Sequence, residues 1–319
     1  MPQPLVPDTD LVIIGGGPAG CAAAVMAASV GMHSVLIEPK ALGHTLHRIP
    51  ALDNVLGFTS GPAYSDALTA DVGRAAHCEV LLGERADQLA PADDHVAVHL
   101  AMSDRAVTGR FAVVATGVRD ARLAEVDWIT SGDARFAPLW DADADTLVDR
   151  TTLVLGADRP LGTFLRSHSN MPLRLVVPYP EADDYKVDEV RSDPRVTLVP
   201  VGSLALSAQP DGQVSAEAIL QGGRSEQWLL AADQVFLNLG NRPAELRGLH
   251  ANPGDGYCPP DRQHPRVLTA GDLRSARAQR IMTATGSGSE AALHAYYAIR
   301  LGDWTSNGTH ASEITGPGD

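Results

Sequence analysis

A glycine-rich turn near the N-terminus constrains the fold of this chain more than any other feature. Residues 10–15 read DLVIIG, a short apolar and β-branched run that predicts a buried parallel strand. Residues 15–20 read GGGPAG and lead into a predicted helix of small residues over 18–31, and the next strand is predicted at 34–38. Strand, glycine turn, helix and strand make a right-handed βαβ unit.

The spacing of the glycines predicts what this turn binds. Gly15, Gly17 and Gly20 fit the pattern GxGxxG. The first glycine permits the tight bend, the second lets a pyrophosphate approach the backbone, and the third lets helix and strand pack closely. The helix N-terminus offers unpaired N–H groups to phosphate oxygens. Glu38 ends the second strand, where a carboxylate accepts hydrogen bonds from ribose hydroxyls. The sequence therefore predicts a dinucleotide site.

A second strand and turn, TTLVLG at 151–156, indicates that the chain contains two nested α/β parts. We predict two nested Rossmann-like three-layer domains, with residues 1–118 and 243–319 in the first and 119–242 in the second. Further strands are predicted at 111–117, 173–177, 196–206, 214–220, 226–230, 234–240 and 266–272, and further helices at 63–77 and 283–301.

Composition narrows the partners and the compartment. The formal net charge of −14 disfavours nucleic acid and anionic membrane as partners, and no clustered basic run reverses this. No apolar stretch reaches the roughly 18 residues that span a bilayer, and no signal peptide is evident, so we expect a cytoplasmic protein. Cys21, Cys78 and Cys258 are far apart, which predicts free thiols, and we expect no metal site.

Several motifs in a fixed order resemble one known family. They are GGGPAG at 15–20, Glu38, NVLGF at 54–58, ATG at 115–117, LG at 239–240 followed by RP at 242–243, and AGD at 270–272. Over nearly the whole chain this order resembles the low-molecular-weight thioredoxin reductases, FAD flavoproteins of the pyridine nucleotide-disulfide oxidoreductase superfamily. The resemblance implies a first domain that binds FAD, a second, nicotinamide-type domain, and a homodimer.

The resemblance also implies which positions contact FAD. They are Gly15, Gly17, Pro18, Ala19, Gly20, Glu38, Pro39, Thr45, Leu46, Asn54, Val80, Ala115, Thr116, Gly117, Gly271, Asp272, Arg280, Ile281 and Thr283.

Two departures from the family pattern change the expected chemistry. The family's CxxC should fall near 130–137, which reads TSGDARFA, so dithiol exchange by the usual route is excluded. The second domain's nucleotide turn reads GADRPLG at 156–162, with Asp158 in place of the second glycine, where a charged side chain blocks the pyrophosphate. VPYPE at 177–181 replaces the basic cluster that binds the 2′-phosphate. We therefore expect that NADPH does not bind in the usual mode.

The loop after the second strand supplies candidate catalytic residues. The family's GGQ is replaced by Gly43-His44-Thr45, and His47 and Arg48 follow. A histidine near a flavin can donate a proton or bind an anion, and Arg48 can hold a substrate carboxylate. The alternative is that these are surface residues of a loop.

Three more side chains have two interpretations each. Cys21 is interpreted as a small core residue, with a redox role as the alternative, and Cys258 as an exposed loop thiol. Trp304 either anchors the end of the last helix or starts a lid over the flavin.

The leading hypothesis is an FAD-dependent oxidoreductase that uses neither NADPH nor an internal CxxC. Its flavin would exchange electrons directly with an electron-transfer protein, such as a ferredoxin, or with a small-molecule substrate. One alternative is a non-catalytic or redox-sensing flavoprotein that binds a protein partner. Another is a reductase that acts on cysteines of its partner.

Overall fold

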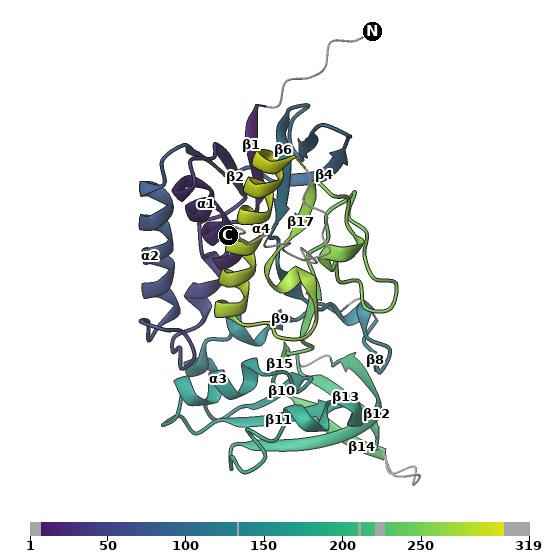
Figure 1. The fold of residues 1–319 in the computed structure, drawn as a ribbon. Helices are drawn as coiled ribbons and strands as arrows, with labels where there is room; N and C mark the ends of the chain where they lie inside the picture. Colours follow the sequence, from purple (N-terminus) through teal and green to yellow (C-terminus); the bar gives the residue numbers. More distant parts are fainter. Residues whose placement is uncertain (1–7, 133, 210–211, 221–226, 303–319) are drawn as a thin grey trace, which may run out of the picture. The chain divides into compact units, whose positions relative to one another are not determined.

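The computed structural model describes residues 8–132, 134–209, 212–220 and 227–302 (Figure 1). The chain divides into two compact units, each with its own sheet. Unit 1 comprises residues up to 44, residues 64–117 and those from 244 onward, and unit 2 comprises residues 45–63 and 118–243. Segment 45–63, which the sequence placed in the first domain, groups with unit 2, where Arg48 forms ion pairs with Asp120 and Asp141.

The sheet of unit 1 is built on parallel strands around the predicted βαβ unit. Its order is β3-β2-β1-β6-β5-β4, and β17 pairs with the C-terminal part of β6. The hairpin β4–β5 joins β6 antiparallel. The strands are β1 Thr9–Ile14, β2 Ser34–Glu38, β3 Cys78–Leu82, β4 Ala86–Pro91, β5 Val96–Leu100, β6 Ala106–Val114 and β17 Val267–Thr269.

Small residues bring two helices of unit 1 close together. Unit 1 contains α1 Pro18–Ser29 and α4 Ile281–Leu301, and α2 Gly61–Arg74 lies mostly within it. α1 and α4 lie side by side (Figure 1). A Cβ atom at Gly288 of α4 would overlap the carbonyl oxygen of Ala19, and α1 reads PAGCAAAVMAAS. The helices therefore approach to backbone contact.

Unit 2 has a second, mostly parallel sheet with an antiparallel extension. Its order is β14-β13-β12-β11-β10-β15-β9, and β8 pairs with β12. A separate two-stranded sheet pairs β16 with β7. The elements are β7 Val118–Asp120, β8 Ile129–Thr130, β9 Ala137–Pro138, β10 Thr151–Leu155, α3 Pro160–Ser167, β11 Arg174–Tyr179, β12 Val196–Ala208, β13 Val214–Leu220, β14 Gln227–Ala232, β15 Gln234–Leu237 and β16 Asn241–Pro243.

Alternating side chains of β10 place apolar cores on both faces of this sheet. Val154 belongs to the cluster that contains α3, and Leu153 and Leu155 belong to the cluster against β12 and β13. All three side chains are fully buried. This period of two is the one expected of a strand covered on both faces.

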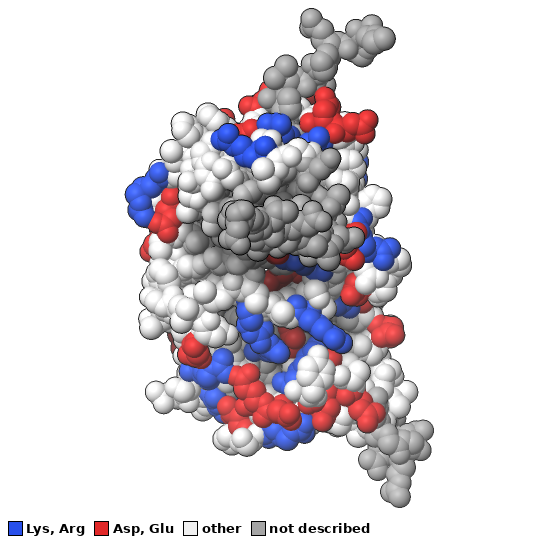
Figure 2. Space-filling view, viewed as in Figure 1, with Lys and Arg blue, Asp and Glu red and all other residues white. Residues whose placement is uncertain are grey.

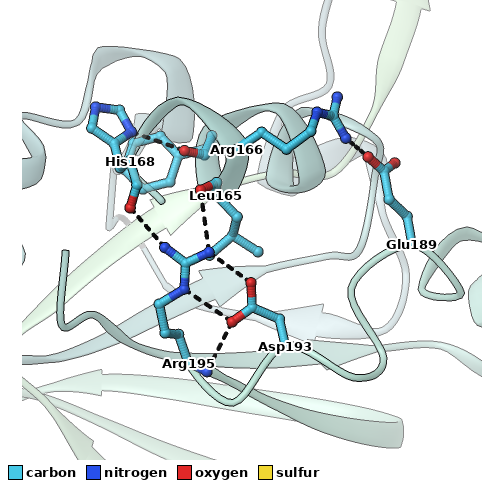
Figure 3. A network of polar contacts seen from close by, with 7 residues as sticks. Leu165, Arg166, His168, Glu189, Asp193 and Arg195 are labelled. Carbon is cyan, nitrogen blue, oxygen red and sulfur yellow. Dashed lines mark hydrogen bonds and ion pairs between the residues drawn. The ribbon is translucent and has the colours of Figure 1, made fainter. Parts of the chain in front are cut away.

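Arg195 closes the C-terminal end of α3 (Figure 3). Its guanidinium donates to the carbonyl oxygens of Leu165 at 3.2 Å and His168 at 2.7 Å, and it pairs with both carboxylate oxygens of Asp193. These bonds satisfy carbonyls that have no partner within the helix. Hydrogen bonding from Arg195 lowers the pKa of Asp193.

We expect Arg195→Met to lower the free energy of unfolding by about 2 kcal/mol, because it removes a donor to Leu165 O, one of the two donors to His168 O and the partner of a half-buried carboxylate. Urea unfolding monitored by circular dichroism measures the change. Arg191→Met is the matched control, since Arg191 pairs with Asp184 and Asp188 at the exposed surface and its loss should change little. Equal changes in the free energy of unfolding for the two substitutions would contradict the stabilising role given to the hydrogen bonds of Arg195.

Candidate functional site

The glycine turn at 15–20 has the geometry that its spacing predicts. Gly15 has φ +104°, and a Cβ there would overlap the carbonyl oxygen of Ala115. A Cβ at Gly20 would overlap the carbonyl oxygen of Gly15. A Cβ at Gly17, in contrast, would have no heavy atom within 4 Å. The first and third glycines are required by the fold, and the second faces open space.

The N-terminus of α1 begins at this open position. Gly17 is the N-cap, no side chain of the described residues caps it, and Pro18 occupies the first turn. The backbone N–H groups of the first turn, including those of Ala19 and Gly20, therefore receive no side-chain partner. A helix start of this kind is an anion site, because its N–H groups and dipole favour negative charge.

Glu38 is fixed beside the turn by backbone donors. Its Oε2 accepts from Gly16 N at 2.7 Å, and its Oε1 accepts from Lys40 N at 2.8 Å. Each carboxylate oxygen retains capacity for a further hydrogen bond. The side chain is thus oriented at the end of β2, as a ribose-binding carboxylate requires.

Asp272 is a half-buried acid that follows β17, next to Gly271, where a Cβ would lie 3.0 Å from the Ala19 side chain of the glycine turn. Burial raises the pKa of its carboxyl to about 6. No hydrogen bond or ion pair reaches that carboxyl from any residue that the structure describes. A carboxyl that is desolvated without a protein partner fits a ligand that supplies hydrogen-bond donors, such as the hydroxyl groups of a sugar or sugar alcohol.

The loop that carries Asp272 is held by Gln279. The amide Nε2 of Gln279 donates to Ser275 O at 3.0 Å, to Asp272 O at 3.3 Å and to the Tyr257 hydroxyl at 3.1 Å. On the other side, Gly271 N donates to Ser287 Oγ at 2.8 Å. The sequence places the stretch 279–283 near the flavin, but it does not predict that Gln279 holds this loop, because these contacts depend on how the loop closes.

We expect Asp272→Asn to stabilise the cofactor-free chain at pH 7 and to weaken cofactor binding. Because the folded pKa of Asp272 is raised from 3.8 to about 6, the native carboxyl opposes folding once the pH exceeds this range. The gain in melting temperature should shrink as the pH falls from about 6 toward 3.8, and it should vanish only below that value, where the carboxyl is protonated in both states. A gain that did not depend on pH would contradict this cause.

The other cofactor positions proposed for unit 1 lie at turns and helix starts. Thr116 Oγ1 donates to Ala244 O at 2.6 Å, and Gly117 O accepts from Ala244 N. Arg280 is the N-cap of α4, where its N–H donates to Thr283 Oγ1 at 3.2 Å, and Ile281 is the first helical residue. Ala115 follows β6, Pro39 is exposed after β2, and Val80 lies half-buried in β3.

The candidate catalytic residues fall in both units. His44 belongs to unit 1, and its Nε2 lies 3.3 Å from Lys40 Nζ. In unit 2, His47 is exposed, and Arg48 lies 3.5 Å from Asp141 and 3.7 Å from Asp120. Arg48 is therefore already engaged by two carboxylates. The proposed cofactor residues Thr45, Leu46 and Asn54 also belong to unit 2.

The corresponding turn of unit 2 is filled by acidic side chains. Gly156 has φ +93°, so the tight bend is retained. Asp158 lies 3.7 Å from Lys186 Nζ, and its carboxyl would lie 3.5 Å from a Cβ at Gly240. The Glu189 carboxyl lies against Gly162 in the first turn of α3, and it pairs with Arg166 (Figure 3). Sequence reasoning found Asp158 and missed Lys186 and Glu189.

Charges on the visible surface are mixed. Among the described residues coloured in Figure 2, Lys and Arg are interspersed with Asp and Glu. Several charged residues of unit 2 form ion pairs, as Arg166 does with Glu189 and Lys186 with Asp183.

The three cysteines are far apart in the sequence, and all three are free thiols in the structure. Cys21 is fully buried, and its thiol donates to Gly16 O at 3.2 Å. Cys258 is also fully buried, so the expectation of an exposed thiol is wrong. Its N–H donates to Leu273 O, which draws it into the core of unit 1. Burial raises the pKa of Cys21 to about 12 and that of Cys258 to about 11. Cys78 is half-buried.

Part of the chain matches the model of a known protein family. Residues 9–157 match the family described as pyridine nucleotide-disulphide oxidoreductase. Over this range, which is somewhat less than half of the chain, the sequence is similar to that family. The matched range begins with β1 and ends in the turn that follows β10, so it includes the glycine turn and Glu38. The resemblance inferred from the sequence motifs is confirmed.

Two solved structures are similar to this chain in fold. The thioredoxin reductase of Lactococcus lactis has a TM-score of 0.79 and 18% identity, with 92% of this chain and 100% of that chain covered. The bacillithiol disulfide reductase of Bacillus cereus has a TM-score of 0.69 and 16% identity, with 90% and 99% covered. The predicted α/β fold with two Rossmann-like domains is therefore confirmed.

A curated relative is longer than this chain. One component of the alkyl hydroperoxide reductase of Staphylococcus aureus is 24% identical over 307 residues, which cover 91% of this chain and 59% of the relative. The chain thus spans less than two thirds of the curated relative that it matches.

Two absences among the described residues bear on other functions. Over the described ranges, no helix is both long and apolar enough to cross a membrane. In the same part of the chain, no three His, Cys, Asp or Glu side chains are grouped so that they could hold a metal ion. Trp304, the candidate lid residue, lies outside the described residues.

Proposed function

We propose that this chain is an FAD-dependent oxidoreductase that exchanges electrons directly between its flavin and a partner other than NADPH. It would do so without an internal CxxC. The partner is an electron-transfer protein or a small-molecule substrate. The homodimer and the cytoplasmic location expected from the sequence stay predictions.

Unit 1 offers a consistent set of contacts for FAD. The open position at Gly17 and the uncapped start of α1 suit the pyrophosphate, and the Glu38 carboxylate suits the adenosine ribose. Asp272 offers an unpartnered carboxyl to ribityl hydroxyls. When bound, the flavin would supply the capacity to accept and release electrons, and the surrounding residues bind and orient it.

The observation that carries the proposal is the contrast between the two glycine turns. The turn of unit 1 has open space at its second glycine, whereas the turn of unit 2 has Asp158 at that position. The Glu189 carboxylate lies against α3 where a nucleotide phosphate would need the helix N-terminus. Asp158 and Glu189, each paired with a basic side chain, thus replace the second glycine and lie against the helix start, so binding of NADPH in the family's mode is disfavoured.

The cysteines support a route without internal thiols. Thioredoxin reductases and bacillithiol disulfide reductases are named for disulfide substrates, and transfer through an enzyme dithiol needs one thiol to attack and one to resolve. In this chain Cys21 and Cys258 are fully buried with raised pKa values, and neither has a neighbouring cysteine in the sequence. Direct exchange between flavin and partner is therefore proposed.

Identification of the released cofactor tests the first half of the proposal. We expect the purified chain to release FAD on heat denaturation, close to one molecule per chain, as measured by chromatography and mass spectrometry. FMN or NAD in its place would contradict the assignment of the Gly17 turn to the pyrophosphate of FAD. Repeated purification without a flavin, followed by no uptake of added FAD, would also contradict it.

A further inference from the structure

A polar cavity lies at the amino-terminal edge of the unit 1 sheet. Strands β1, β2 and β3 begin there with Thr9, Ser34 and Cys78. The glycine turn follows the opposite, carboxyl-terminal end of β1. The cavity has a volume of about 320 Å³ and is lined by Asp8, Thr9, His33, Ser34, Val35, His77, Cys78 and Glu79.

Cys78 is the only one of the three cysteines that is not buried. Its side chain is half-buried and lines the cavity, whereas Cys21 and Cys258 are fully buried. Thiol–disulfide exchange requires access of the attacking thiolate to the disulfide sulfur. Cys78 therefore meets a condition that the other two cysteines do not.

Ser34 provides a second, independent feature of the cavity. Its side chain is only 2% exposed, and its hydroxyl makes no hydrogen bond in the described structure. Ser34 and Cys78 are direct neighbours across β2 and β3. Burial raises the pKa of the Cys78 thiol, and the Ser34 hydroxyl opposes this by donating to the thiolate form. A buried hydroxyl without a partner thus gains an acceptor when Cys78 ionises.

The charged residues that line the cavity favour one kind of reactant. The cavity contains the carboxylates of Asp8 and Glu79, and none of its lining residues is Lys or Arg. The rings of His33 and His77 stack at the rim, with centroids 4.4 Å apart. With a net charge of −14 on the whole chain, the local field favours a cationic reactant over an anionic one.

We propose that Cys78 is a modification site at which this cavity accepts a low-molecular-weight disulfide bearing ammonium groups. The Cys78 thiolate attacks one sulfur of the disulfide R–S–S–R, and the bond between its two sulfurs breaks. A Cys78–S–S–R mixed disulfide forms, and R–S⁻ leaves and takes up a proton from water. The small disulfide is the oxidant, so the exchange needs no other electron acceptor. Neither the flavin nor unit 2 takes part.

Intact-mass measurement with cystamine as the probe tests the proposal. We expect one half-cystamine adduct per folded chain, removable by a reducing agent, and peptide mapping should place it on Cys78. Cys78→Ser should lose the adduct, and Cys258→Ser, the matched control, should retain it. Ser34→Ala should slow the reaction about threefold, because a lost donor to the thiolate reduces its population more than it raises its reactivity.

Charge selectivity is measured by comparing cystamine with dithiodipropionate, a dianionic disulfide of similar size. The quantity compared is the rate with cystamine divided by the rate with dithiodipropionate. At low salt we expect this ratio to be about tenfold higher for the folded chain than for the same chain unfolded in urea. The difference should fall as the salt concentration rises. The proposal is overturned if the adduct maps to Cys21 or Cys258, if the folded chain stays unmodified while the unfolded chain reacts, if Ser34→Ala leaves the rate unchanged, or if the dianion reacts as fast.

Discussion

Valine in place of Gly17 is expected to give a folded chain that purifies without FAD. Gly17 has φ −77°, which any residue adopts, and a Cβ there contacts nothing within 4 Å. The new side chain would instead occupy the space in which the pyrophosphate must approach the start of α1. We expect the affinity for FAD to fall at least about 100-fold, which corresponds to about 3 kcal/mol.

The flavin content of the purified variant measures this effect, and its circular dichroism shows whether the fold is retained. Gly73→Ala is the matched control, because Gly73 lies in α2 and a Cβ there also meets nothing within 4 Å. Alanine at this helical position should stabilise the fold slightly and leave the flavin content unchanged. Retention of FAD by Gly17→Val at the wild-type level would show that the cofactor lies elsewhere.

Alanine in place of Gly288 is expected to lower the free energy of unfolding by about 3 kcal/mol. The added methyl group would overlap the carbonyl oxygen of Ala19, a backbone atom at the start of α1. Since a backbone oxygen has no rotamer by which to give way, α4 must shift away from α1. This shift would also disturb the glycine turn, so the variant should bind FAD more weakly.

Gly286→Ala is a close control for this substitution. Gly286 lies on the same helix two residues earlier, and a Cβ added there would meet no heavy atom within 4 Å. The substitution should be neutral or stabilising, because alanine has the higher helix propensity. Thermal unfolding measures the melting temperatures of Gly288→Ala and Gly286→Ala. Equal values would contradict the backbone contact between α1 and α4.

Local sequence patterns were sufficient to predict the first βαβ unit. The run DLVIIG, the turn GGGPAG and Glu38 are adjacent in the sequence, and their structural roles depend on contacts within the same short segment. The predicted helix over 63–77 corresponds to α2 Gly61–Arg74, and the predicted final helix corresponds to α4 Ile281–Leu301.

Features that depend on distant contacts were missed. Cys258 follows a glycine-rich stretch that resembles an exposed loop, yet its N–H bonds to Leu273 O and its side chain enters the core. The Glu189 carboxyl lies against Gly162, 27 positions earlier in the sequence. Segment 45–63 belongs to unit 2, where Arg48 pairs with Asp120, although the segments before and after it in the sequence belong to unit 1. No local pattern encodes these pairings.

Anaerobic titration of the flavin with NADPH and NADH tests the central claim most directly. We predict that neither nucleotide bleaches the flavin absorbance at stoichiometric amounts, because Asp158 and Glu189 fill the turn of unit 2. Dithionite, which needs no binding site, should bleach the same sample. Fast and stoichiometric bleaching by either nucleotide would contradict the proposal that the flavin of this chain takes its electrons from another donor.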